Sequence, residues 1–154
     1  MLNQEFLKQT TLFKELTEDE LLEVILIGHV KKFKANTEIF REGDPGDTLY
    51  LIISGCVRIS KMTSGTEEAL AVLEGKSFFG EMTLFDRQPR SAYAIAHEDA
   101  EVFAISADDL IALFDNNKRI AYKFLWAFCL TLTTRLRSTN EKFEVIMSLA
   151  NDGF

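Results

Sequence analysis

The feature that most restricts the fold is a long unbroken segment that runs from Asn117 to about Ala150. It contains no glycine or proline, the two residues that most often interrupt a helix. About 33 residues at 1.5 Å each predict a helix roughly 50 Å long, longer than the preceding domain is wide. Its apolar residues recur along the whole length, at Ile120, Phe124, Ala127, Leu130, Leu132, Leu136, Phe143, Ile146 and Met147.

A helix with apolar residues along its whole length needs a second surface to cover them. We expect that surface to be a symmetry-related copy of the same helix, which makes the chain a homodimer through residues 117–150. Of the many aromatic residues, we expect Phe124, Trp126 and Phe128 to line the seam between the two helices. The alternative is a monomer whose helix folds back on its own domain.

The residues before this helix predict a mainly β domain with short flanking helices. Thr17 and Glu20 have the spacing of a capping box, and Ala107–Phe114 is typical of a second short helix. Short β-branched or aromatic stretches alternate with glycine-bearing turns between them, at residues 30–33, 38–40, 49–53, 57–61, 69–73, 92–96 and 100–105. This rhythm predicts an antiparallel jelly-roll barrel over residues 1–116, followed by the long helix over 117–150.

Charge argues against nucleic acid as a partner. The chain of 154 residues has 17 Lys and Arg against 24 Asp and Glu, a net charge of −7. Residues 117–154 alone carry a small positive excess, with six basic and three acidic side chains. An acidic body repels phosphates, and a few lysines and arginines on one helix do not form a binding stripe.

Location follows from what the sequence lacks. Cys56 and Cys129 do not form a disulfide framework and fit a reducing compartment. No secretory signal is visible at the N-terminus. The longest apolar run, Phe124–Leu132, has nine residues, too few to span a bilayer. We therefore expect a cytoplasmic protein that does not enter a membrane.

The densest group of chemically informative residues lies at positions 78–92, which we call the cassette. Gly80 permits a close turn, and free N–H groups after it would suit an anion. Arg90 can hold a phosphate through two parallel hydrogen bonds, and Ser91 adds a hydroxyl donor. Glu81 would repel a phosphate, so it fits either a sugar hydroxyl or a pair with an arginine. An anion and a hydroxyl together describe a sugar phosphate.

The cassette resembles the phosphate-binding segment of cyclic-nucleotide-binding domains, whose pattern is Phe-Gly-Glu, a short helix, then Pro-Arg-Ser/Thr-Ala. The likeness extends over nearly the whole chain and is strongest to the bacterial cAMP receptor protein type. It implies that Glu81 binds the ribose 2′-hydroxyl, that Arg90 binds the cyclic phosphate, and that Ser91 completes the phosphate contacts. It also implies backbone contacts at Gly80 and Ala92, and apolar walls from Leu73, Phe79 and Met82.

The resemblance favours cAMP, with cGMP as the alternative. Tyr93 follows the cassette where cGMP-selective members often carry Thr or Ser. The family's long helix uses a Thr-Ser pair at the adenine, and this chain has Thr139 and Asn140. Neighbouring helical residues point about 100° apart, so one can face its own pocket and the next the partner. Asn140 could contact the base or pair with its counterpart in the seam.

These observations together predict a regulatory binding protein. We find no nucleophile–base pair, paired acids or metal-ligand spacing, so we expect neither enzymatic activity, a cofactor nor a metal. The chain ends where transcription factors of this type continue into a helix-turn-helix domain, so we expect a nucleotide-controlled switch that acts on an unknown protein effector. The alternatives are the sensor part of a truncated transcription regulator and a dimeric scaffold that binds no nucleotide.

Overall fold

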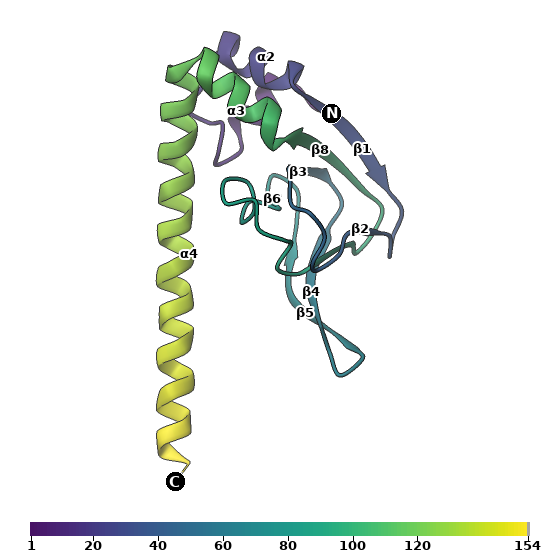
Figure 1. Cartoon of the computed structure of the whole chain (residues 1–154), viewed down its shortest axis with the longest axis vertical. Coiled ribbons are helices and arrows are strands. Elements are labelled where there is room, and N and C mark those ends of the chain that lie inside the picture. The colour runs from purple at the N-terminus through teal and green to yellow at the C-terminus, as the bar shows by residue number, and fades with distance from the viewer. Residues whose placement is uncertain (154) are drawn as a thin grey trace.

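The computed structural model describes residues 1–153 of the chain (Figure 1). The helices are α1 (Gln4–Lys8), α2 (Glu18–Leu26), α3 (Ala107–Asn116) and α4 (Lys118–Asp152). The strands are β1 (Gly28–Phe33), β2 (Glu38–Phe40), β3 (Thr48–Ser54), β4 (Val57–Thr63), β5 (Thr66–Leu73), β6 (Phe78–Phe79), β7 (Tyr93–Ala96) and β8 (Ala100–Ser106).

The strands form two antiparallel sheets, in the orders β1-β8-β3-β6 and β2-β7-β4-β5. Strand β3 explains how the layers are arranged, because it is buried on both faces. Leu49 and Leu51 point into a core shared with the helices. Tyr50 and Ile52 alternate with them and point toward the second sheet. The first sheet is therefore the middle layer of the domain.

The fold class predicted from the sequence is confirmed as a jelly-roll type of antiparallel fold with flanking helices, although the strands form two sheets and not one closed barrel. The predicted capping box is present, because the Thr17 hydroxyl accepts from the Glu20 amide and the Glu20 carboxylate accepts from the Thr17 amide. Strand β6 was not predicted, because its two residues are too few to show an alternating pattern. In the cassette, residues 82–86 form a hydrogen-bonded turn, which is shorter than the short helix of the family pattern that the cassette resembles.

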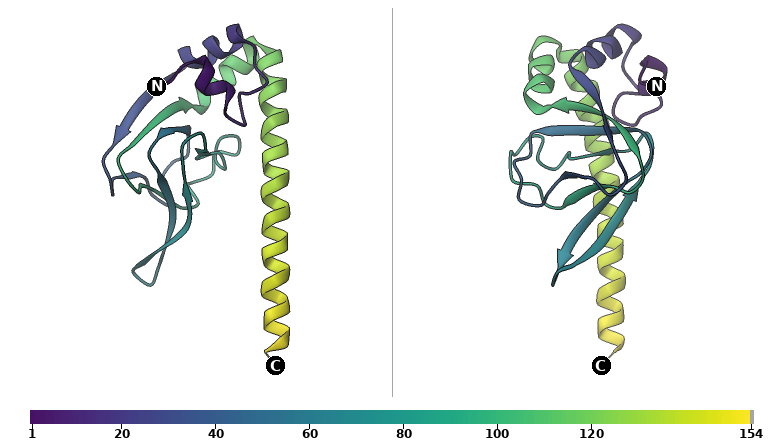
Figure 2. Two further views of the ribbon diagram at one scale, coloured as in Figure 1. Left: turned by 180° about the vertical axis from the view of Figure 1, so that it is seen from behind. Right: turned by 90° about the vertical axis from the view of Figure 1, so that its right-hand side faces the viewer.

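The long helix α4 lies beside the domain and extends past it. Figure 2 shows α1, α2 and α3 gathered around its N-terminal end, while its C-terminal end reaches beyond the β4–β5 hairpin. Its first half is packed on the domain and held by two polar contacts from α2. Lys123 pairs with buried Glu20 at 2.7 Å, and the Asn117 amide donates to Glu23 at 3.2 Å.

The expectation that Phe124 and Phe128 line a helix seam is wrong. Both side chains are buried within their own domain. Phe124 packs against Phe13 and Phe114, with ring centroids 5.7 and 5.1 Å away. Residues four apart share one helix face, and here that face covers the domain core. Trp126 points elsewhere and is exposed.

None of the helices within residues 1–153 combines the length and the apolar character needed to cross a bilayer.

Candidate functional site

A pocket of about 250 Å³ lies where the cassette meets the second sheet and α4. Its lining comes from several elements that are far apart in the sequence. The lining residues are Phe40, Ile59, Ala71, Leu73, Phe78, Phe79, Gly80, Glu81, Met82, Thr83, Arg90, Ser91, Ala92 and Arg135. The pocket is thus walled by carbon on the strand side and by charged groups on the cassette and α4 side.

The backbone of the cassette is fixed at both ends. Gly80 has a φ of +79°, and a Cβ there would lie 2.8 Å from both the Thr48 carbonyl and an Arg90 nitrogen. Glycine is therefore required at this position. At the other end, the Arg90 amide donates to the Asp44 carbonyl, and the Gly43 amide donates to the Arg90 carbonyl, both at 2.8 Å. The turn at residues 42–47 consequently sets the position of Arg90.

Arg90 is a buried cation, with only 4% of its surface exposed. Its Nη1 donates to the Gly80 carbonyl at 2.9 Å and to the Thr83 hydroxyl at 3.0 Å, and its Nη2 donates to the Thr48 carbonyl at 2.9 Å. Its guanidinium carbon lies 4.1 Å from the ring centroid of Phe40. These contacts hold the side chain rigidly beside the pocket.

Arg90 forms no ion pair among the described residues, although the carboxylates of Asp47 and Glu81 lie near enough to favour its charged form. All three hydrogen-bond acceptors are uncharged, and Nε is buried with no hydrogen-bond partner among the described residues. Burial lowers the pKa of the guanidinium because the charged form loses hydration. A buried, unpaired cation is costly in the absence of an anion. The pocket therefore presents a fixed positive group suited to an anionic ligand.

Glu81 lines the pocket together with Arg135 of α4, with which it forms an ion pair. Its carboxylate, 12% exposed, pairs with the Arg135 guanidinium of α4. Arg135 also lies over the ring of Phe78, with its central carbon 4.6 Å from the ring centroid. The cassette and the long helix are thus joined by an ion pair at the pocket wall. Of the two roles considered from the sequence, pairing with an arginine is what the structure shows.

The structure brings eight of the ten predicted site residues to this pocket. They are Leu73, Phe79, Gly80, Glu81, Met82, Arg90, Ser91 and Ala92. Thr139 and Asn140 are exposed on α4 and do not line the pocket of this single chain. The Thr139 hydroxyl donates to the Arg135 carbonyl at 2.9 Å, so it follows Arg135 by one helical turn. Tyr93 is also absent from the lining.

Sequence reasoning missed six lining residues, of which Arg135 carries the most chemistry. It lies 54 positions from its partner Glu81. A signal was nevertheless present, because Arg135 continues the helix face that Phe124, Phe128 and Thr131 turn toward the domain. Phe40, Ile59, Ala71, Phe78 and Thr83 carried no comparable signal.

The fold and the pocket together define a jelly-roll binding domain for a small anionic ligand. Residues 30–117, more than half of the chain, match the family model "Cyclic nucleotide-binding domain". The chain belongs to this family.

Individual relatives agree with this assignment. The Cyclic AMP receptor protein of Thermus thermophilus is 32% identical over 91% of this chain, which spans 63% of that protein. Human cGMP-dependent protein kinase 2 is 32% identical over 61% of this chain, corresponding to 13% of the kinase. A cyclic nucleotide-binding domain from Methylobacillus flagellatus superposes with a TM-score of 0.79 at 27% identity, covering 90% of this chain and 78% of that one.

Proposed function

We propose that this chain is a dimeric cyclic-nucleotide receptor that binds cAMP in preference to cGMP and transmits binding through α4 to a protein effector. Arg90 carries the proposal. A buried guanidinium with neutral acceptors and a free Nε matches a cyclic phosphate, whose negative charge would neutralise it. Ser91, also on the pocket wall, supplies a hydroxyl for the same phosphate.

The sugar would be held at Glu81. An ionised carboxylate has two acceptor oxygens, and the pair with Arg135 engages only Oε1. Oε2 is therefore suited to accept from a ribose 2′-hydroxyl, which a 2′-deoxy nucleotide lacks. In this arrangement Arg135 orients the carboxylate and offsets its repulsion of a negatively charged ligand.

The base would lie against the apolar strand side of the pocket, beside Ile59, Ala71 and Leu73. These side chains cannot distinguish adenine from guanine by hydrogen bonding. The preference for cAMP therefore rests on the cAMP receptor named among the relatives and on the resemblance at Tyr93. The kinase relative named for cGMP makes cGMP the natural competitor.

Dimerisation is proposed from a stripe on α4 that we call the pairing stripe. Its members are exposed, uncharged and spaced alternately by three and four residues, which is the spacing of a parallel two-stranded coiled coil. They are Tyr122, Leu125, Cys129, Leu132, Leu136, Thr139, Phe143 and Ile146. With the flanking Met147, the pairing stripe forms a continuous exposed surface along α4, and a stable interface typically uses about 800 Å² per chain.

The same pairing would give Thr139 and Asn140 different positions. Thr139 belongs to the pairing stripe and lies one turn beyond Arg135, on the side that faces its own pocket. Asn140 falls at the edge of the stripe, which in a parallel pair faces the partner's Arg135 and hence the partner's pocket. We propose that both residues reach the base only in the dimer. A nucleotide held by the cassette and by two helices would favour one helix position over others.

Calorimetric titration of the purified protein with cAMP and cGMP tests the proposal. We expect one cAMP per chain, micromolar or tighter binding, and weaker binding of cGMP. Arg90→Ala should lower the affinity at least about a hundredfold, because it removes a charge-assisted phosphate contact from a buried site. Arg90→Lys, which retains the charge but not the fork of donors, should give an intermediate loss.

Arg87→Ala is the matched control, since Arg87 lies three residues away and pairs with exposed Asp108 instead of lining the pocket. Circular dichroism of each variant establishes that it is folded. If protein stripped of any copurified nucleotide binds neither ligand, the pocket assignment is wrong and the nucleotide-free scaffold becomes the better description.

A further inference from the structure

Trp126 is an exposed aromatic residue that belongs neither to the domain core nor to the pairing stripe, beside which it lies. It is the single tryptophan of the chain, and 59% of its surface is exposed. It stacks on Tyr122, another exposed aromatic residue, with ring centroids 6.4 Å apart. Large exposed aromatic groups on an otherwise ordered helix indicate a contact surface.

Helical geometry specifies which surface Trp126 faces in the proposed dimer. Trp126 directly follows Leu125 of the pairing stripe, so it occupies the same edge as Thr133 and Asn140, at intervals of seven. In a parallel pair, this edge lies against the opposite edge of the partner helix. That opposite edge carries Phe128 and Arg135, which are the α4 residues next to the cassette.

The cassette exposes apolar groups at the same height along the helix. Phe85 packs edge-on against Phe128, with ring centroids 5.5 Å apart, yet 45% of its surface remains exposed. Met82 is 67% exposed on the same segment. Trp126 and Phe128 are two positions apart, which separates them by about 3 Å along the helix axis. Trp126 of one protomer and Phe128 of the partner therefore lie at nearly the same height in a parallel pair.

We propose that Trp126 of each protomer packs on the cassette of its partner, against Phe85 and Met82, and so braces the partner's nucleotide pocket from outside. The inference rests on the proposed parallel dimer and adds a second contact between protomers to the helix seam. The contact joins three apolar side chains that the single chain leaves in water, which is its physical driving force. It also links the segment that holds Arg90 in one protomer to α4 of the other.

The bracing contact has a functional consequence. A nucleotide that orders the cassette of one protomer also orders the surface on which the partner's Trp126 rests. Occupancy of one pocket is therefore communicated to the other helix without passing through the seam. The two pockets should consequently bind nucleotide with unequal apparent affinities once one is filled.

A double-mutant cycle on the dimer dissociation constant, measured by sedimentation with the full chain, tests the contact. Trp126→Ala and Phe85→Ala should each raise the constant about tenfold, and the double variant should raise it by less than about thirtyfold. Independent residues would instead multiply to about a hundredfold, which overturns the proposal. Leu130→Ala is the control, because Leu130 is exposed on α4 but lies on neither edge facing the partner.

Met82→Ala replaces Phe85→Ala if the latter disturbs the packing on Phe128, since Met82 is mostly exposed. Tryptophan fluorescence gives an independent reading that reports on Trp126 alone. Emission should be shifted to shorter wavelength in the dimer relative to the dissociated Leu136→Glu variant, and Met82→Ala should reduce the shift. An antiparallel pair, which places Trp126 far from the cassette, would show no effect of Met82→Ala and would overturn the inference.

The outcomes separate this inference from the proposals on which it rests. A wild-type chain that sediments as a monomer removes both the dimer and the bracing contact, whatever calorimetry shows for nucleotide. A stable dimer with independent effects of Trp126 and Phe85 removes the bracing contact alone.

Discussion

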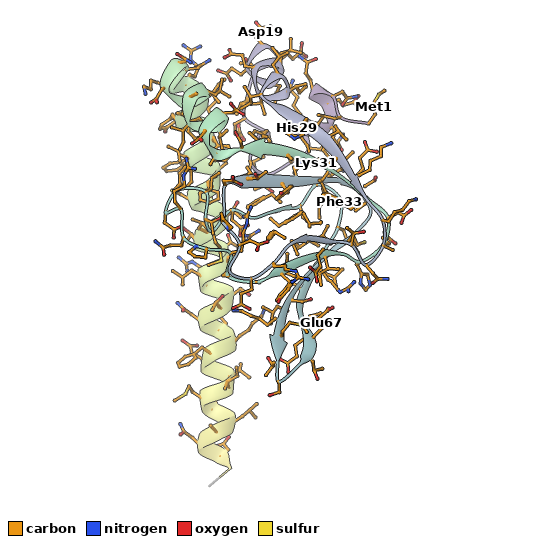
Figure 3. The ribbon with its side chains drawn as sticks, turned by 45° about the vertical axis from the view of Figure 1, so that its right-hand side comes forward. Met1, Asp19, His29, Lys31, Phe33 and Glu67 are labelled. Atoms are coloured by element: carbon orange, nitrogen blue, oxygen red, sulfur yellow. The ribbon has the colours of Figure 1, made fainter. Side chains whose placement is uncertain are left out.

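The first half of α4 and its second half are made of similar residues but have different surroundings. Up to Arg135, buried or half-buried residues recur every turn and pack on the domain; beyond Arg135, every described residue is exposed. Phe124 and Phe143 illustrate the contrast, since the first is fully buried and the second is 61% exposed. In Figure 3, side chains of the last turns of α4 project with no other segment of the chain around them.

One continuous helix therefore serves two structural purposes. The first half completes the domain core, whereas the second half presents apolar groups that only another molecule can cover. Arg135 is the boundary between them and is also the α4 residue that pairs with Glu81. The nucleotide pocket thus lies where the anchored half of the helix ends, which is where a ligand can influence the free half.

The largest expected effect is a difference in the free energy of unfolding between substitutions in the two halves of α4. Phe124→Ala should lower the free energy of unfolding by about 3–5 kcal/mol, because it leaves a cavity among packed aromatic rings. Phe143→Ala removes the same atoms from an exposed position and should leave the stability of the dissociated chain nearly unchanged. Urea unfolding at several protein concentrations measures both quantities. Equal losses for the two variants in dilute protein would contradict the contrast.

A charge placed in the pairing stripe should weaken the dimer and leave the stability of the domain unchanged. Leu136→Glu places like charges together in the proposed seam and should raise the dimer dissociation constant at least about a hundredfold, without unfolding the domain. Sedimentation at micromolar protein measures the effect. Leu130→Glu, on the same helix but off the stripe, should remain dimeric. A dimer that survives Leu136→Glu would show that the stripe is not the interface.

Removal of the Arg135 side chain should lower the affinity for cAMP more than it lowers the stability of the fold. Arg135→Ala leaves Glu81 unpaired next to the bound phosphate and should weaken cAMP binding about tenfold. Arg137→Ala, two residues later and exposed, is the control. Calorimetry compares the two variants. Unchanged affinity in Arg135→Ala would mean that the ion pair is structural and does not bear on the ligand.

The smallest expected effect concerns the ion pair between Glu20 and Lys123 in the first half of α4. Burial raises the pKa of Glu20, but the hydrogen bonds from Lys123 and from the Thr17 amide outweigh it, so the net pKa is lowered. Its stabilising contribution is therefore complete above the ordinary value of 4.5 and is lost as the pH falls through the lowered value.

Glu20→Gln should consequently cost about 0.5–1 kcal/mol at pH 7 and progressively less in acid. Thermal unfolding of both proteins from pH 7 to pH 3 follows this convergence. A difference that stays constant over that range would assign the effect to packing instead of charge.

Several features could be predicted from the sequence because they depend on neighbours along the chain. The capping box at Thr17, the long helix and the glycine-dependent turn at Gly80 follow from local rules of backbone geometry. The cassette residues were identified for the same reason, since Gly80, Glu81 and Arg90 lie within one short segment. The expected orientation of Phe124 and Phe128 was wrong because periodicity shows that a helix has an apolar face but not which surface meets it.

Local sequence patterns predicted most of the helices and strands, the family resemblance and most of the cassette side of the pocket. Packing in three dimensions brings Arg135 to Glu81 across 54 positions and buries Arg90 with its Nε unbonded among the described residues. Only the tertiary structure divided α4 into an anchored and an exposed half. The physical reason is that burial and charge pairing depend on which distant segments pack together, whereas propensity and spacing act within a few residues.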